Sequence, residues 1–268
     1  MITSPSNSKI KHVAMLQKDA GLRKMEALFV TEGFRMTSEV PPVLLRELYL
    51  SESAAGKPEY ADLAKKLTDP AGGYTGEEVC IVADKAFERM CDTKHPQGIC
   101  AVVSKPSYKK EDIFPRQANG KERYLILENV QDPGNVGTMV RTAEAAGMTA
   151  VLFAGTCADL FNPKTIRSTM GSLFRVPFLH FSQTGEMLEL LKNRGIRTFA
   201  AALEGSVSYR DAVYGEKCAV MIGNEGNGLS KEAISLADER IRIPMEGKVE
   251  SLNASISAAV LMYEMGRE

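Results

Sequence analysis

The sequence predicts an α/β protein in which a small α/β domain precedes a mainly parallel sheet with helices on both faces. Residues 123–268 repeat the order strand, turn, helix, the pattern of a parallel sheet covered by helices. Residues 106–121 are polar, lack periodicity and contain two prolines, which is typical of a linker. We therefore expect a first domain at 1–105, a linker at 106–121 and a second domain at 122–268, a division that 268 residues can accommodate.

The first domain is expected to hold short strands and a few helices. Asn7 is placed to cap a helix that runs to about residue 20, because Ile10, Val13 and Leu16 form an approximate apolar stripe. A further helix is expected at 84–90. Apolar runs predict strands at 27–31, 46–50, 78–82 and 98–103.

The second domain is expected to alternate buried strands with helices. Apolar runs predict strands at 124–127, 150–154, 198–203, 218–222 and 240–243. Capping residues predict where the helices begin: Asn135 for 135–146, Asn162 with Pro163 for 163–170, Thr184 for 184–194 and Ser230 for 230–238. A long helix at 252–265 closes the chain.

The composition is that of an ordinary soluble globular protein, with 44% hydrophobic and 25% charged residues and a formal net charge of -1. Basic residues gather at 1–25 and 161–175, where they are either solvated helix faces or local phosphate-binding sites. The 5 cysteines are scattered without a C-x-x-C pair, so we expect neither disulfides nor a metal site, and a cytoplasmic location. Residues 1–7 lack the apolar core of a signal peptide, so we expect none, and no apolar run approaches the length of a membrane span.

Residues 223–228 (GNEGNG) form a glycine-rich turn after an apolar strand. Such turns allow a ligand to approach the backbone at the carboxyl end of a strand. The order G-x-x-G-x-G differs from the dinucleotide fingerprint, and a phosphate-binding-loop lysine is missing. A nucleotide-dependent oxidoreductase is therefore disfavoured, whereas a structural turn with an incidental Glu225 remains open.

Residues 132–142 (DPGNVGTMVRT) hold Asn135 at an expected helix start and Gly137 in its first turn. Glycine costs about 1 kcal/mol relative to alanine in a helix, which suggests close packing or a ligand there. Arg141 lies two turns in, among small apolar residues, and is expected to be buried. A buried arginine needs an anionic partner, such as a phosphate or Glu225.

Residues 247–255 (GKVESLNAS) combine Ser251 and Asn253 with small side chains that permit close backbone contact. One interpretation is a helix cap at Ser251 with Asn253 exposed. The other joins this segment to the two preceding turns in a single pocket. No turn decides the question alone, but their combination favours the pocket.

These turns resemble, in order and wording, the motifs of the SpoU (TrmH-like) family of RNA 2′-O-ribose methyltransferases. The matching segments are 129–143 (NVQDPGNVGTMVRTA), 220–229 (VMIGNEGNGL) and 243–255 (IPMEGKVESLNAS), with support from 162–177. The resemblance covers 123–268. Residues 29–35 and 95–99 are similar, more loosely, to the family's RNA-binding substrate domain. One departure is Asn224, where many members have Ser or Ala.

The resemblance implies a deep trefoil knot, an S-adenosyl-L-methionine cofactor and a homodimer. It implies an RNA substrate, for which we expect 23S ribosomal RNA; a transfer RNA substrate and a non-catalytic RNA-binding protein are the alternatives. Arg141 is expected to act on the 2′-hydroxyl, oriented by Glu225, with Asn135, Ser251 and Asn253 holding ribose, phosphate or cofactor. The cofactor pocket is expected to include Ile222, Gly223, Ile243, Met245, Leu252 and Asn253, and RNA is expected to contact Lys9, Lys11, Arg35 and Arg167.

Overall fold

The computed structural model describes residues 1–76, 79–114 and 120–267, and it divides the chain into two compact units. Unit 1 comprises 1–107 with 159–174, and unit 2 comprises 108–158 with 175–268. The expected division into folding domains at 1–105, 106–121 and 122–268 stays a prediction. Residues 115–119 of the expected linker, and Glu78 at the start of an expected strand, lie outside the described residues.

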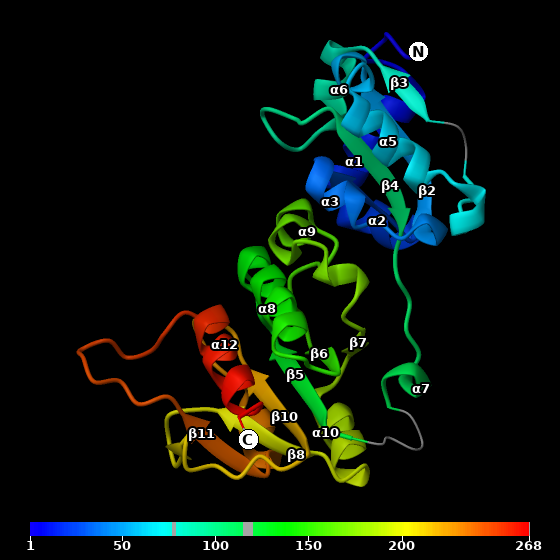
Figure 1. The fold of residues 1–268 in the computed structure, drawn as a ribbon. Helices are drawn as coiled ribbons and strands as arrows, with labels where there is room; N and C mark the ends of the chain where they lie inside the picture. The colour runs from blue at the N-terminus through cyan, green and yellow to red at the C-terminus, as the bar shows by residue number, and fades with distance from the viewer. Residues whose placement is uncertain (77–78, 115–119, 268) are drawn as a thin grey trace. The chain divides into compact units, whose positions relative to one another are not determined.

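Unit 1 is built on a four-stranded sheet in the order β1-β4-β2-β3, with β4 antiparallel to β1 and β2 (Figure 1). Its elements are α1 (Ser8–Lys18), α2 (Ala20–Glu26), β1 (Leu28–Glu32), α3 (Phe34–Ser38), η1 (Pro42–Leu44), β2 (Leu45–Ser51), α4 (Glu52–Ala55), α5 (Pro58–Leu67), η2 (Pro70–Gly72), β3 (Cys80–Val82), α6 (Asp84–Met90), β4 (Ile99–Ser104), α9 (Pro163–Thr169) and η3 (Ser172–Phe174).

The two faces of this sheet bury different partners. Asn7 caps α1 as expected, with Oδ1 accepting from Lys9 N at 2.9 Å. The buried stripe of α1 packs with α6 against one face, around Val30 and Tyr49. Phe29 alternates to the other side of β1, where its ring lies 5.0 Å from Phe161 of the 159–174 segment.

Unit 2 is built on a seven-stranded sheet in the order β7-β6-β5-β10-β8-β11-β9, and all its neighbouring strand pairs are parallel. The prediction of a mainly parallel sheet is confirmed. Its elements are α7 (Lys110–Ile113), β5 (Glu122–Glu128), α8 (Pro133–Ala145), β6 (Ala150–Ala154), β7 (Phe178–Phe181), α10 (Thr184–Asn193), β8 (Arg197–Ala201), β9 (Val207–Ser208), β10 (Lys217–Ile222), α11 (Lys231–Leu236), β11 (Glu239–Arg242) and α12 (Ala254–Glu264).

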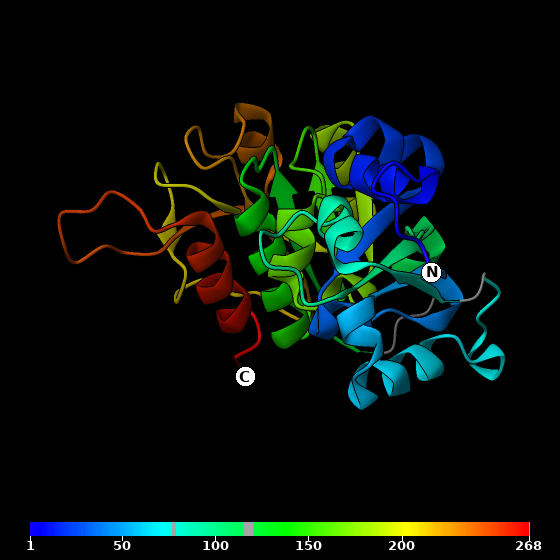
Figure 2. The ribbon, with the colours of Figure 1, turned by 90° about the horizontal axis from the view of Figure 1, so that it is seen from above.

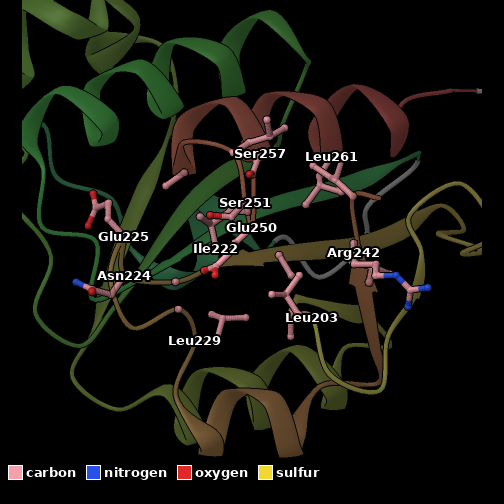
Figure 3. Close-up of a pocket in the computed structure, with 18 of the residues that line it drawn as sticks. Leu203, Ile222, Asn224, Glu225, Leu229, Arg242, Glu250, Ser251, Ser257 and Leu261 are labelled. Carbon is pink, nitrogen blue, oxygen red and sulfur yellow. The ribbon is translucent and has the colours of Figure 1, made fainter. Parts of the chain in front are cut away.

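Helices cover both faces of this sheet, as the sequence predicts. Ile126 and Met221 belong to a core cluster with residues of α10 and α11, and α7 adds Ile113 to it. On the opposite face, α12 packs against α8 and β10 (Figure 3). The segment that joins β11 to α12 reaches outward before the chain returns to the middle of the sheet (Figures 1 and 2).

Two predicted helix caps in unit 2 are wrong, and the alternative interpretation of Ser251 as a helix cap is excluded. Asp132, not Asn135, caps α8, because Pro133 occupies the first helical position and Asp132 Oδ1 accepts from Asn135 N at 2.8 Å. Thr184 is already helical, and its hydroxyl donates to Glu128 instead. Asn253, not Ser251, caps α12. The expected caps Asn162 and Ser230 are confirmed for α9 and α11.

Candidate active site

A cavity of about 720 Å³ lies at the carboxyl ends of β8, β10 and β11, beneath α12 (Figure 3). This volume is within the range of small-molecule sites in proteins. Its walls include both the second and the third turn singled out in the sequence. Eight of the expected site residues line it: Ile222, Gly223, Glu225, Ile243, Met245, Ser251, Leu252 and Asn253.

The glycine-rich turn is closed by its own backbone. Asn224 N donates to Gly228 O at 3.0 Å, and Gly228 N donates back to Asn224 O at 2.9 Å. A Cβ on Gly223 would overlap the backbone of Gly228 and Leu229, so only glycine fits at this strand end. The requirement for glycine here is therefore structural, and it shapes one wall of the cavity.

Asn224 ties this turn to the neighbouring strand. Its Oδ1 accepts from Gly226 N and Asn227 N, both at 3.0 Å, and its Nδ2 donates to Asn129 O at 3.0 Å, just beyond β5. A serine or alanine at this position is too short to make both sets of contacts. Asn224, the residue that departs from the family pattern, thus adds hydrogen bonds between the two strand ends that the family resemblance does not predict.

The Glu225 carboxylate binds the turn that opens α8. It accepts from Gln131 N, Asp132 N and Asn135 Nδ2, each at 3.0 Å. Partial burial alone would raise the pKa of Glu225, but the hydrogen bonds from Asn135, Gln131 and Asp132 outweigh it and hold the pKa below its ordinary value. Glu225 is thus an anion that joins two turns.

Asn135 continues this connection to the third turn. An ionised carboxylate can only accept hydrogen bonds, so Asn135 faces Glu225 with its NH₂ group. Its Oδ1 then accepts from Asn253 Nδ2 at 3.1 Å. The Oδ1 of Asn253 in turn accepts from Ser255 N at 2.9 Å and from the Ser255 hydroxyl at 2.6 Å. All donors and acceptors in this chain agree, and the three turns form one network.

Arg141 does not belong to this network, contrary to expectation. It is exposed on α8 rather than buried, because the buried face of the helix is formed by Val136, Met139, Val140 and Ala143. Within the described residues, no hydrogen bond or ion pair links Arg141 to a partner. The partners of Glu225 are two backbone amides and Asn135, so the expected Glu225–Arg141 pair is absent from the described residues.

The walls of the cavity fit the cofactor that the sequence resemblance implies. Ile222, Leu229 and Leu203 offer an apolar surface, and Ser257 and Leu261 project from α12 (Figure 3). Glu250 and Ser251 add polar groups, whereas the Arg242 guanidinium points away from the cavity (Figure 3). Such a site suits a ligand with a flat apolar portion and a few polar groups.

Glu128 supports the site from behind and was not foreseen. It is only 2% exposed at the end of β5. Its carboxylate accepts from the Thr184 hydroxyl at 2.7 Å, from Ser230 N at 2.7 Å and from the Ser230 hydroxyl at 2.8 Å. These bonds fix the start of α11 directly after Leu229. An acid at the end of an apolar strand was the available sequence signal.

The expected RNA-binding residues all lie in unit 1, but in different places. Lys9 and Lys11 are on α1, whereas Arg35 and Arg167 line a second cavity. Arg167 also pairs with Asp92 at 2.8 Å. In the basic N-terminal segment, Arg23 is 2% exposed and pairs with Asp159 at 2.6 Å. Part of each basic segment is therefore neutralised within the protein.

Two further observations concern the described residues alone. They contain no group of three or more His, Cys, Asp or Glu side chains that could hold a metal ion. None of their helices is both long and apolar enough to cross a membrane.

All five cysteines are free thiols, and burial raises the pKa of the Cys218 thiol to about 11.

Comparisons with known proteins agree with this geometry. Residues 122–263 match the SpoU rRNA Methylase family, and residues 7–101 match an MRM3-like substrate binding domain. The 23S rRNA (guanosine(2553)-2'-O)-methyltransferase RlmP of Bacillus subtilis is 30% identical over 98% of this chain and 98% of its own length.

Solved structures give the same result. An AdoMet-bound rRNA methyltransferase from Sinorhizobium meliloti superposes with a TM-score of 0.85 at 27% identity, over 98% of this chain and 96% of that one. The SpoU methyltransferase AviRb from Streptomyces viridochromogenes superposes with a TM-score of 0.81 at 25% identity, over 97% and 96% of the two chains.

Proposed function

The chain belongs to the SpoU rRNA methylase family and is an S-adenosylmethionine-dependent RNA 2′-O-methyltransferase; on that premise we propose that its substrate is a ribose in 23S ribosomal RNA. The relative RlmP, which matches over nearly the whole of both chains, carries that activity in its name. A ribosomal substrate implies action in the cytoplasm.

The observation that carries the proposal of an active site is the network joining Glu225, Asn135 and Asn253. It joins the first family motif to the second and third, which line one cavity, and the donor and acceptor directions agree throughout. When bound, S-adenosylmethionine supplies an electrophilic methyl group. The proposed residues for holding it are Ile222, Gly223, Ile243, Met245, Leu252 and Asn253, through an apolar wall and backbone groups at the strand ends.

The 2′-hydroxyl must lose a proton as it is methylated, and its developing negative charge needs a cation. We assign this role to Arg141. Its guanidinium is exposed and makes no ion pair among the described residues, so it is available to an RNA oxygen or phosphate. Because a guanidinium stays protonated near neutral pH, Arg141 acts as an electrostatic stabiliser, and an RNA phosphate beside it is the proposed proton acceptor.

The remaining site residues position the reactants. Glu225 acts on the turn that opens α8, and it orients Asn135 rather than Arg141. Ser251 lines the cavity with an exposed hydroxyl that is available to ribose or cofactor. Lys9, Lys11, Arg35 and Arg167 of unit 1 are proposed to contact RNA, which predicts binding that weakens steeply with added salt.

We also propose that the protein acts as a homodimer through α12. This helix is apolar around most of its circumference, and Ile256 and Tyr263 are 53% and 58% exposed. A helix that is apolar on all sides is normally buried on all sides, so a second copy would cover the exposed residues. Ile256→Lys is expected to yield monomers in light scattering, whereas an unchanged mass would contradict this interface.

The family's trefoil knot is the corresponding proposal for the fold. The chain leaves β11 near one edge of the sheet, extends outward, and returns as α12 to pack on β10 and α8 near the middle. A return of this kind is unusual, because connections in most folds avoid threading through loops.

The decisive experiment incubates the protein with labelled S-adenosylmethionine and three RNAs: a 23S transcript, a 16S transcript and bulk transfer RNA. We expect label in the 23S transcript, at a ribose that resists alkaline cleavage. Label confined to transfer RNA would overturn the proposed substrate. A further arm of the experiment uses total RNA from a strain that lacks the gene. Cofactor binding without methyl transfer to that RNA or to any of the other three would instead favour a non-catalytic protein.

A further inference from the structure

The second cavity, of about 280 Å³, lies wholly within unit 1. Three segments form it: the end of β1 with the first turn of α3, the loop that precedes β4, and α9 with the residue after it. The side chains that matter below are Arg35, Met36, His95, Gln97, Arg167 and Met170. It is separate from the cofactor cavity, which is lined by residues of unit 2 alone.

Hydrogen bonds to one buried carboxylate hold this cavity in shape. Glu32 is 9% exposed, and its carboxylate accepts from Asp92 N at 2.8 Å, from Thr93 N at 3.3 Å and from the Thr93 hydroxyl. Gln17 Nε2 donates to the same carboxylate at 3.3 Å. The loop that carries His95 is therefore anchored at its start. Removing its acceptor would leave buried donors without partners.

The far end of the same loop is anchored to the turn that leads into α3, the helix that carries Arg35. Gln97 Oε1 accepts from Phe34 N at 2.7 Å, and Gly33 N donates to Ile99 O at 3.0 Å. Gly33 has a φ of +90°, where a side chain would be strained and would press on Gln97. No hydrogen bond from Gln97 Nε2 to another described residue accompanies this arrangement, so Nε2 can donate to a ligand.

The lining combines three kinds of chemistry in a small space. Arg35 and Arg167 supply guanidinium groups, and Arg167 donates to Asp92 through Nη1. His95 and Gln97 supply hydrogen-bonding groups that match the edge of a nucleobase. Met36 and Met170 supply polarisable thioethers, which pack well against aromatic rings. A site for a bare anion would not require two methionine side chains in its wall.

We propose that this cavity binds one unpaired nucleotide of the RNA substrate, with its base between the methionines and its phosphate at Arg35. The proposal rests on the proposed function, because it needs an RNA substrate. The volume suits a single nucleotide rather than a helix. Proteins recognise RNA sequence chiefly through unstacked bases in loops and bulges, since the bases of an A-form duplex are poorly accessible.

The test titrates the full-length protein, labelled with ¹³C at its methionine methyl groups, with each of the four nucleoside 5′-monophosphates. The Met36 methyl signal, identified with a Met36→Leu variant, reports on the cavity. We expect saturable shifts with at least one nucleotide and none with ribose 5-phosphate or inorganic phosphate. Equal shifts with inorganic phosphate would reduce the cavity to an anion site, and no shift with any nucleotide would overturn the proposal.

Variants make the test specific. Arg35→Ala should weaken nucleotide binding by about tenfold, the loss of one charge-assisted contact, and His95→Ala should weaken it less. Both side chains are exposed, so neither change disturbs the core. Lys94→Ala is the matched control: it removes a positive charge from the same loop but does not line the cavity. Equal weakening by Lys94→Ala would indicate a diffuse charge effect and would contradict the proposal.

Methylation assays on the same variants separate this proposal from the proposed function. If nucleotides bind in the cavity but the protein methylates no RNA, the cavity stands and the function fails. If the protein methylates 23S RNA and the KM for RNA is the same in wild type, Arg35→Ala and His95→Ala, the function stands and the cavity proposal fails. The affinity for S-adenosylmethionine should be the same in all of them.

Discussion

Asn253 donates a hydrogen bond to Asn135 at 3.1 Å, across 118 positions of sequence. Asn135 in turn donates to Glu225 at 3.0 Å. The start of α8, the glycine-rich turn and the start of α12 are thereby held together by side chains that can each satisfy both neighbours at once. Positioning of this kind matters for methyl transfer, because the reactants must be aligned before the bond forms.

Asn135→Ala should break this network at its centre. It removes a donor to an ionised carboxylate and an acceptor for Asn253, and hydrogen bonds to charged groups contribute about 1.5–3 kcal/mol. We expect kcat/KM for RNA methylation to fall by about 10- to 150-fold, which is the same free energy expressed as a ratio of rates. Thr138→Ala, an exposed change on the same helix, is the control and should leave the rate near wild type.

Gly223→Ala tests the closed turn beside the cavity. The added methyl group would overlap the backbone of Gly228 and Leu229, and overpacking of this kind costs about 1–3 kcal/mol. The free energy of unfolding should fall by about this amount, and binding of S-adenosylmethionine, measured by calorimetry, should weaken because this wall of the cavity must shift. Gly247→Ala has open space around its Cβ and serves as the control; wild-type cofactor affinity in Gly223→Ala would refute the structural role given to this glycine.

Glu225→Gln should produce a stability difference that depends on pH. The amide keeps the shape of the carboxylate but turns an NH₂ group toward a donor. The pKa of Glu225 is lowered in the folded protein, so its stabilising contribution is present above the unfolded value of about 4.3 and is lost as pH falls through the lower folded value. Thermal midpoints of the two proteins should differ most near pH 7 and converge once the pH falls below the lowered folded pKa of Glu225; a difference independent of pH would contradict the assignment.

Arg141→Ala should abolish turnover while leaving the fold and the cofactor affinity intact. The side chain is exposed and has no partner among the described residues, so little packing is lost. Arg141→Lys keeps the charge but not the planar fork, and it should recover only part of the rate. Circular dichroism and calorimetry check the fold and the cofactor; near-wild-type methylation by Arg141→Ala would require another residue to stabilise the oxygen.

Local sequence signals predicted much of the fold. The buried strands of unit 2 are continuous apolar runs. Asn162 followed by Pro163 marks the start of α9, because a capping side chain and a proline at the first helical position both specify a helix start from adjacent residues. The same pattern occurs at α8, where Asp132 directly precedes Pro133. The sequence therefore contained the signal for the correct cap, and the prediction of Asn135 overlooked it. The helix at Pro58–Leu67 and the strands at Phe178–Phe181 and Val207–Ser208 were not foreseen.

The hydrogen-bond partners of the site residues could not be predicted from their neighbours in sequence. Glu225 bonds to residues about ninety positions earlier, and nothing near Glu225 specifies which end of α8 it meets. The exposure of Arg141 likewise depends on which face of α8 is covered by α12 and the sheet. The family resemblance identified the residues of the site, but it did not supply their contacts.

The hydrogen bond from Asn253 to Asn135 has a consequence for synthesis. A nascent chain that stops before Asn253 already holds every strand of the parallel sheet, which ends at Arg242, and both other turns of the network. It still lacks Asn253 Nδ2, which donates to Asn135 Oδ1. The sheet can therefore form during translation, whereas the network that joins the three turns is complete only after Asn253 has been added and α12 has packed on α8.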